Sequence, residues 1–314
     1  MLEQPVLHPV RFAGDQPALR QRNLAALLDL LRRHTTLTRT ELAQMTGLNR
    51  ATITRLVREL IALGLVCEDG VLAAAAGRPA ISLRLNSAAG MIIGAEIGFA
   101  SVSAIVTDFT PTIVTRVERK LRPDEHRDAA LDKAMNAFCA AYEAAIRWKR
   151  PVFGMGLGVP GLVDAATGTL LFAPNLGWSD VPLKQMLEDR LRIPVLVDNV
   201  ASVSALGEST FGAAQNHRVV LYLSTQGGLG GRIVVDGHIL RGASGFAGEV
   251  GHMTVAESGR RCNCGRVGCW ETRASQMALL QAVRERLAAG EPSTLRDAIG
   301  DPAQITVAMV AEAA

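Results

Sequence analysis

The apolar positions near the start of the chain recur with the period of an α-helix. Four leucines share one predicted buried face at spacings i, i+3, i+4 and i+7: Leu24, Leu27, Leu28 and Leu31. Residues 1–18 show no sustained period, so we expect them to form a mobile tail. The first regular element is therefore a helix that begins near residue 19.

Two shorter helices are predicted next, joined by a tight turn. Thr38 is followed three residues later by Glu41, which is typical of a capping box, and Gly47 can end that helix. Asn49 can cap the following helix. The apolar stripe of this last helix comprises Ile53, Leu56, Val57 and Leu60. Two short helices joined in this way predict a helix-turn-helix, whose second helix enters the major groove of DNA.

The outer side of that second helix is basic. The polar residues expected to face DNA are Arg50, Thr54, Arg55 and Arg58. Arginine binds phosphates or reads guanine edges, and a threonine hydroxyl can donate to a phosphate. The alternative is a small helical bundle used for protein contacts.

A two-stranded wing is predicted after these helices. Its strands are Leu65-Val66-Cys67 and the segment 81–85, with a turn at Asp69-Gly70. Gly77-Arg78-Pro79 lies at or near the tip, from which Arg78 can enter a narrow minor groove. Residues 19–87 are thus predicted to form a winged helix-turn-helix DNA-binding domain.

Beyond residue 87, apolar strands alternate with helices. The expected strands are Met91–Gly98, Val102–Asp108, Val152–Val159, Val195–Asn199 and Val219–Ser224. The expected helices are Ala129–Arg147, Leu183–Leu191 and Ile305–Ala313, and a turn is expected over 160–164. This alternation predicts an α/β domain with a largely buried sheet.

The charge of the chain is unevenly distributed. Residues 1–85 carry 11 arginines, no lysine and seven acidic residues, a net charge of +4, whereas the rest has a net charge of −1. This asymmetry fits a DNA-binding module attached to a neutral body. Nothing in the sequence resembles a membrane span or a signal peptide, so we expect a cytoplasmic protein without membrane contacts.

Several segments resemble the ROK family of repressors and sugar kinases, and among its members the xylose-type repressors. The matching segments are GLGVPGLVD at 156–164, PNLGW at 174–178, VDNVASVSALGE at 197–208, GASGFAGEVGHMTV at 242–255 and CNCGRVGCWE at 262–271. The resemblance implies an actin-like ATPase (sugar-kinase-like) fold with lobes at 88–198 and 199–314. ROK proteins extend further at the C-terminus, so the second lobe is expected to be truncated.

Three of the five cysteines lie within eight positions, a clustering that favours metal over disulfides in a cytosolic chain. The resemblance implies that zinc is bound by one imidazole and three thiolates: His252, Cys262, Cys264 and Cys269. Four protein ligands fill a tetrahedral shell, so a structural zinc ion is expected. Reduced, buried thiols are the alternative.

The resemblance also implies a sugar site. The matching positions are Asn199, Glu249, His252 and Glu271, with Asn175 as a further candidate. His252 would join the metal to the sugar through its two ring nitrogens. The alternative is that Glu249 and Glu271 are only acidic residues of loops.

Three departures from the family's kinases predict that no residue here is catalytic and that no ATP is bound. Val200 follows Asn199 where the kinases have the aspartate that takes the proton of the attacking hydroxyl. The phosphate hairpin D-x-G-G-T is replaced by a segment containing Glu96 and Phe99. Arg232 stands where the family usually has glycine, and it could bind some anion.

The sequence therefore predicts a sugar-responsive repressor of carbohydrate-utilisation genes with a catalytically inactive sensor domain. Its expected partners are double-stranded operator DNA and an aldose, and a homodimer or a dimer of dimers would read two half-sites. An active ROK sugar kinase with an N-terminal regulatory domain is one alternative. A repressor controlled by a protein partner is another.

Overall fold

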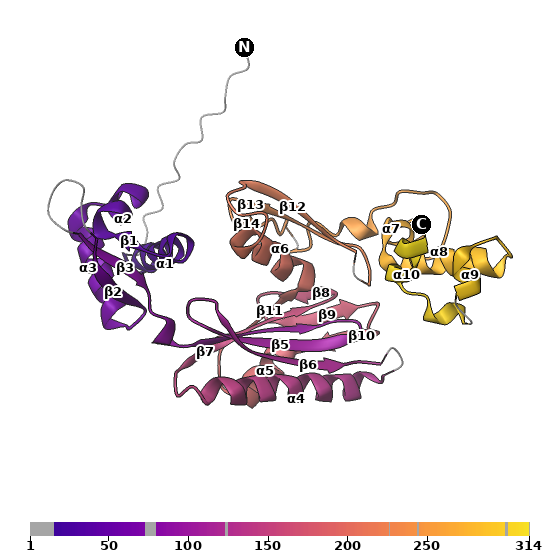
Figure 1. The fold of residues 1–314 in the computed structure, drawn as a ribbon, viewed down its shortest axis with the longest axis horizontal. Helices are drawn as coiled ribbons and strands as arrows, with labels where there is room; N and C mark the ends of the chain where they lie inside the picture. Colours follow the sequence, from indigo (N-terminus) through magenta and orange to yellow (C-terminus); the bar gives the residue numbers. More distant parts are fainter. Residues whose placement is uncertain are drawn as a thin grey trace, which may run out of the picture. The chain divides into compact units, whose positions relative to one another are not determined.

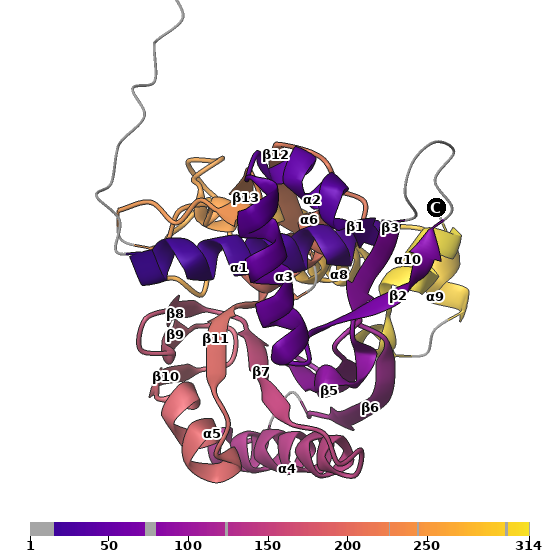
Figure 2. The same ribbon diagram turned by 90° about the vertical axis from the view of Figure 1, so that its left-hand side faces the viewer.

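A computed structural model shows the helices and strands of most of the chain (Figures 1 and 2). It describes residues 16–72, 80–122, 125–225, 227–243, 245–298 and 301–313. The chain divides into two units. The first consists of Met1–Ile92, Thr107–Val114 and Ile146–Pro151, and the second of Ile93–Val106, Thr115–Ala145 and Val152–Ala314.

Three helices lead the first unit. They are α1 (Gln16–His34), α2 (Arg39–Thr46) and α3 (Arg50–Ala62). Helix α1 includes residues 16–18, so the prediction that these three belong to a tail was wrong, and residues 1–15 lie outside the described part. The apolar stripes take up the predicted faces and bury Leu27 and Leu31 of α1 together with Leu42 of α2.

The ends of α2 and α3 are set by the predicted capping residues. The Thr38 side chain accepts a hydrogen bond from the Glu41 backbone, and Glu41 accepts one from the Thr38 N–H at 2.7 Å. Gly47 ends α2 with a φ of 70°, a conformation that suits glycine. Asn49 caps α3 by accepting from the N–H of Thr52. The predicted helix-turn-helix is confirmed at the level of its individual caps.

A small antiparallel sheet completes the first unit, in the order β1-β3-β2. Its strands are β1 (Leu37–Thr38), β2 (Val66–Leu72) and β3 (Ala80–Leu85). The predicted turn at Asp69-Gly70 was wrong, because β2 continues through it with a register shift between Glu68 and Val71. Gly70, at a φ of 86°, supplies the left-handed conformation of a bulge, and Ser82 Oγ donates to the Asp69 carbonyl at 2.9 Å. Residues 73–79, with the predicted wing tip, lie outside the described residues.

A five-stranded sheet in the order β11-β7-β4-β5-β6 follows the short helix η1 (Ser87–Ala89). Its strands are β4 (Met91–Ile97), β5 (Ser101–Asp108), β6 (Ile113–Lys120), β7 (Val152–Val159) and β11 (Val195–Asn199). Helices α4 (Arg127–Ile146) and α5 (Leu183–Leu191) lie on one face of it in both views. Strands β11 and β7 are parallel, so the carboxyl end of β11 at Asn199 lies beside that of β7 at Val159.

A second antiparallel sheet, β10-β9-β8, follows β7. Its strands are β8 (Leu162–Asp164), β9 (Thr169–Ala173) and β10 (Trp178–Val181). The turn predicted over 160–164 is therefore shorter than expected, because its last three residues pair with β9. Gly161 has a φ of 115°, and a Cβ there would overlap the backbone of β9, so the chain can turn this tightly only at glycine.

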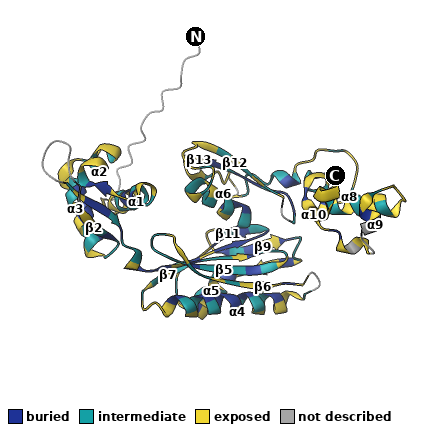
Figure 3. Ribbon diagram, in the orientation of Figure 1, coloured by how far each residue is buried: buried dark blue, intermediate teal, exposed yellow. Residues whose placement is uncertain are grey.

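Helix α6 (Val200–Phe211) lies between the five-stranded sheet and a third sheet, β12-β13-β14. The strands of this third sheet are β12 (Val219–Ser224), β13 (Gly230–Val235) and β14 (His238–Ile239). Three small buried residues, Ala201, Ser202 and Ala205, form the inward side of α6. On β12, Val219, Leu221 and Leu223 are exposed while the residues between them are half-buried, as Figure 3 shows for these elements.

Short helices and loops make up the rest of the described chain. They are η2 (Val250–His252), α7 (Glu271–Ala274), α8 (Gln276–Ala288), α9 (Thr294–Ala298), η3 (Pro302–Gln304) and α10 (Val307–Ala313). Helix α10 begins two residues later than predicted. In the described ranges, no helix combines the length and the apolar character that crossing a membrane requires.

Candidate functional site

The residues predicted to face DNA gather on one side of α3. They line a surface depression of the first unit formed by Arg50, Ala51, Thr54, Arg55 and Arg58. The three arginines are exposed and have no hydrogen-bond or ion-pair partner among the residues that the structure describes. Other arginines of this unit are paired, as Arg20 is with Glu59 at 2.6 Å. The α3 guanidinium groups are therefore free to bind an external anion.

The structure does not support the other two predicted DNA contacts in the same way. The Thr54 hydroxyl donates to the Arg50 carbonyl at 2.8 Å, so its proton is not available to a phosphate in this conformation. This back-bond closes one helical turn and does not depend on DNA. Arg78 lies outside the described residues, and its minor-groove contact stays a prediction.

A cavity of about 470 Å³ lies in the second unit, within the size range of small-molecule sites. It brings together all five predicted sugar-binding residues: Asn175, Asn199, Glu249, His252 and Glu271. They come from the β9–β10 loop, the end of β11, the two sides of η2 and the start of α7. Most of the other lining residues are apolar, among them Leu162, Phe172, Val200, Leu229 and Phe246. The contact of the five polar residues with a sugar stays a prediction.

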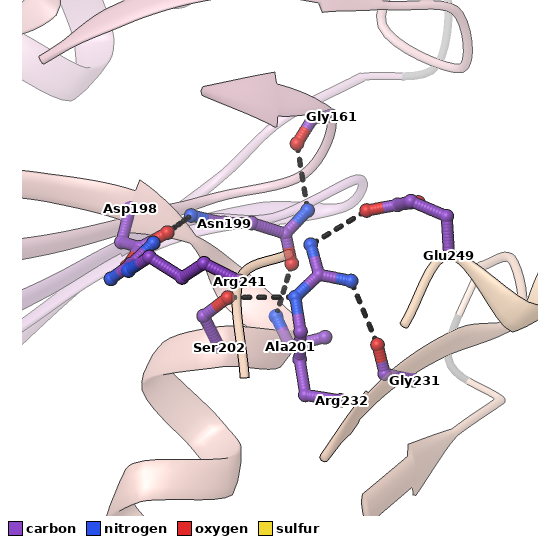
Figure 4. Close-up of polar contacts among 9 residues, drawn as sticks. All are labelled: Gly161, Asp198, Asn199, Ala201, Ser202, Gly231, Arg232, Arg241 and Glu249. Carbon is purple, nitrogen blue, oxygen red and sulfur yellow. Dashed lines mark hydrogen bonds and ion pairs between the residues drawn. The ribbon is translucent and has the colours of Figure 1, made fainter. Parts of the chain in front are cut away.

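The side chain of Asn199 is held in place by two hydrogen bonds (Figure 4). Its Nδ2 donates to the Gly161 carbonyl at 2.7 Å, and its Oδ1 accepts from the Ala201 N–H at 2.8 Å, which caps α6. Each of these atoms keeps one further hydrogen-bonding position for a ligand. Asn175 Oδ1 accepts a hydrogen bond from Asn263 Nδ2 at 2.6 Å. This bond links the β9–β10 loop to residues 262–269, the cysteine-rich segment.

The two carboxylates of the cavity are also fixed by protein groups. Glu271 Oε2 accepts from the Leu229 N–H at 3.0 Å. Glu249 Oε1 accepts from Arg232 Nη2 at 2.6 Å, an ion pair that the sequence did not predict. Arg232 is buried and uses its donors on protein partners, so the idea that it binds an external anion was wrong. A signal for this was available, since a charge on an otherwise apolar strand needs a buried partner.

The four predicted metal ligands converge. One ligand atom from each of His252, Cys262, Cys264 and Cys269 lies within 4.8 Å of all the others. Cys264 Sγ is 3.7 Å from Cys269 Sγ, and Cys262 Sγ is 3.6 Å from His252 Nδ1. A tetrahedral zinc ion with ordinary bond lengths separates two sulfurs by about 3.8 Å and a sulfur and nitrogen by about 3.6 Å. The residues therefore fit a four-coordinate zinc ion, with His252 Nδ1 on the thiol side.

The thiols of this cluster differ in acidity. Burial raises the pKa of Cys262 to about 12. Burial also acts to raise the pKa of Cys264, but hydrogen bonds from the backbone and side chain of Arg266 and from the other two cysteines outweigh it and lower that pKa to about 7. One thiolate thus forms readily near neutral pH, and a cation is the natural partner for further deprotonation.

The glycine-rich turn at 227–231 is closed on one side by Phe99. A Cβ on Gly227 would overlap the Phe99 ring, and Gly227 has a φ of 72°. The aromatic ring of the β4–β5 turn therefore lies directly against the backbone of the glycine-rich turn. At the cavity, Val200 begins α6 right after Asn199 and offers only an apolar side chain.

Comparison with protein-family profiles gives two matches. The profile of the ROK family matches residues 92–314, and that of the IclR helix-turn-helix domain matches residues 22–70. The two matches do not overlap, and they divide the chain into a helix-turn-helix part and a ROK part. Both agree with the elements described above.

The chain is also similar to individual proteins of known sequence or structure. The chain is 34% identical to the xylose repressor of Bacillus spizizenii, over 87% of this chain and 71% of that one. The crystal structure of a ROK family transcriptional regulator, a homolog of the Escherichia coli MLC protein, superposes with a TM-score of 0.78 at 28% identity, over 94% of this chain and 74% of that one. A ROK family glucokinase from Streptomyces griseus, solved with glucose and AMPPNP, superposes with a TM-score of 0.61 at 35% identity, over 71% and 70% of the chains.

Proposed function

Because the chain belongs to the ROK family and joins a helix-turn-helix to a ROK body, we propose that it is a DNA-binding transcriptional repressor that responds to a sugar. The observation that carries this proposal is the row of arginines on α3, which have no partner in the described part of the chain and lie beside a wing whose core strands are in place. Such a face binds phosphates and base edges. We propose that the protein acts in the cytoplasm, where its DNA target lies.

The effector is a neutral aldose bound in the 470 Å³ cavity. Amide and carboxylate groups there can accept and donate to sugar hydroxyls, and the apolar walls can contact the C–H faces of the ring. The name of the Bacillus relative makes D-xylose the first sugar to test. His252 supports the site, since its Nδ1 faces the thiols while Nε2 is left for a ligand.

Zinc is the proposed resident metal, held by His252, Cys262, Cys264 and Cys269. With four protein ligands it would tie η2 to the cysteine-rich segment and fix the position of His252. Bound by these four residues it would have no open coordination position and would supply no chemistry to the effector. Its role is structural.

The body is proposed to bind sugar without phosphorylating it. Val200 has no proton-accepting group, and loss of a general base costs about 10²–10⁴-fold in rate. Phe99 occupies space against Gly227 where a phosphate would need the bare backbone. The similarity to a glucokinase makes this a point to test, because the fold is shared with active enzymes.

Two copies of the chain would read two operator half-sites, as helix-turn-helix repressors do. The sugar must bind the DNA-free form more tightly than the DNA-bound form, since only such a difference can couple the two sites.

Fluorescence anisotropy of a labelled upstream fragment, at fixed salt and with a panel of aldoses, tests the proposal. We expect specific binding that D-xylose weakens. Specific binding that no sugar changes would favour control by a protein partner. Absence of specific binding, together with sugar-dependent ATP consumption, would favour the kinase alternative.

A further inference from the structure

A buried guanidinium group lies directly behind the effector cavity. Arg232 of β13 is 4% exposed, and its Nε, Nη1 and Nη2 each have a protein acceptor (Figure 4). Nε donates to Ser202 Oγ at 2.8 Å and Nη1 to the Gly231 carbonyl at 2.7 Å. Nη2 donates to Glu249 Oε1 at 2.6 Å. A charge this deeply buried is tolerated only when it is paired and hydrogen-bonded, so the ion pair with Glu249 is required for Arg232 to stay where it is.

The surroundings of Arg232 provide space for its long side chain. The inward side of α6 carries the small residues Ala201, Ser202 and Ala205, all buried. A larger residue at Ser202 would meet the guanidinium group, and an apolar one would leave Nε without its acceptor. The helix and the strand are therefore matched to this one arginine.

Glu249 depends on Arg232 for its orientation. It precedes η2 but makes no side-chain capping bond to it. Its Oε1 is bonded to Arg232, while Oε2 has no hydrogen-bond partner among the described residues. Since Glu249 lines the cavity, Oε2 is the carboxylate oxygen left for a ligand.

Two other polar residues of the cavity, Glu271 and Asn199, have side chains that are bonded to backbone groups. Glu271 is held by the Leu229 N–H, and Asn199 by the Gly161 carbonyl and the Ala201 N–H. Glu249 differs from these two because its partner is the side chain of Arg232, which a single substitution can remove without changing the backbone.

We propose that Arg232 is a positioning residue of the effector cavity, which fixes Glu249 so that Oε2 accepts hydrogen bonds from the hydroxyls of a neutral sugar. This rests on the proposed sugar-sensing function. The Arg232 charge also balances that of Glu249, so Glu249 presents a hydrogen-bond acceptor to the cavity without an unpaired negative charge of its own. That combination suits an uncharged polyol better than a cationic ligand.

The test compares D-xylose binding by isothermal titration calorimetry in five versions of the 314-residue chain. They are the parent, Arg232→Gln, Glu249→Gln, the double variant, and Arg218→Gln as a matched control. Arg218 lies just before β12 of the same sheet and pairs with exposed Asp236, away from the cavity. We expect each single cavity variant to bind about tenfold more weakly or worse, as for loss of a charged hydrogen bond. The double variant should be no weaker than the weaker single, because Arg232 acts through Glu249.

Zinc content and the circular dichroism spectrum show whether each variant is folded. If Arg232→Gln does not fold, Arg232→Lys replaces it, and we expect Lys to recover part of the affinity because it keeps the charge near Glu249. If a folded Arg232→Gln chain binds D-xylose as tightly as the parent, this inference is overturned while the proposed function stands. The same holds if the losses of affinity in the two single variants multiply in the double variant. Failure of the parent to bind any aldose of the panel would overturn the proposed function and this inference together.

Discussion

Replacing Arg50, Arg55 and Arg58 of α3 together by alanine should weaken DNA binding and flatten its dependence on salt. All three side chains are exposed, and none has an ion-pair partner within the described ranges. The loss of each should therefore change the free energy of unfolding by no more than about 0.5 kcal/mol. The effect on DNA arises because each phosphate contact releases condensed counterions.

The magnitude follows from the number of arginines. Each phosphate neutralised contributes about 0.9 to the slope of log K against log salt concentration. Removing three phosphate-binding arginines from a DNA-binding module reduces the slope by about 2.7, so doubling the salt should weaken the parent about sixfold more than the variant. An arginine that reads a guanine edge would add about 1–3 kcal/mol of sequence preference, which the variant would lose only at that base pair.

Anisotropy titrations at four salt concentrations, on operator and scrambled DNA, measure both quantities. Arg218→Ala, which removes an exposed arginine paired with Asp236, is the control and should leave the slope unchanged. A triple variant with the slope of the parent would refute the assignment of α3 as the phosphate-contacting helix. A lower slope on both DNAs, with specificity kept, would show that these arginines contact only the backbone.

Three further predictions concern other parts of the chain. Thr38→Ala should destabilise the first unit by about 1 kcal/mol at pH 7 in thermal unfolding. The Thr38 N–H and hydroxyl lower the pKa of Glu41 from its usual 4.5. Alanine keeps the N–H, so only the part of the effect that comes from the hydroxyl bond to Glu41 is present above that value and is lost as the pH falls through the lowered pKa; a difference that grows at acid pH would contradict this. Cys269→Ser, or a chelator, should reduce bound zinc measured by mass spectrometry and lower the melting temperature, while equal zinc in both chains would refute the ligand assignment. Val200→Asp should leave sugar-dependent ATP consumption at background, because Phe99 still covers Gly227; measurable turnover would show that only the base was missing.

The local elements of this chain could be predicted because their determinants are close in sequence. A capping box needs only Thr38 and Glu41, and the helices and strands around it follow from apolar periodicity. The errors were at turns and at helix starts. Asp69-Gly70 is a frequent turn pair, but pairing with β3 keeps it in a strand with a bulge, and only the partner strand reveals this.

The site could be predicted only in part for the same reason. Convergence of His252 with the three cysteines was readable because a family pattern lies in one segment of about twenty residues. The restraints on the cavity join residues far apart, as Arg232 joins Ser202 on α6 to Glu249 before η2. Neither spacing nor composition indicates which acid a buried arginine will meet. The sequence did not indicate that the Thr54 hydroxyl would donate to a carbonyl of its own helix, and its contact with DNA stays a prediction.

The three departures from the kinase pattern act on different parts of one site. On the proposed function, Val200 removes proton transfer, Phe99 fills space at the phosphate turn, and Arg232 stabilises Glu249 in its binding orientation. The first two remove chemistry and leave the sugar-lining groups untouched, whereas the third strengthens one of them. A protein that only lost activity by drift would not need a buried arginine with three protein acceptors at this position, since such a residue is costly without its partners. The proposed function, sugar binding without turnover, is consistent with all three departures; the Arg232→Gln variant tests the binding and the Val200→Asp variant tests the absence of turnover.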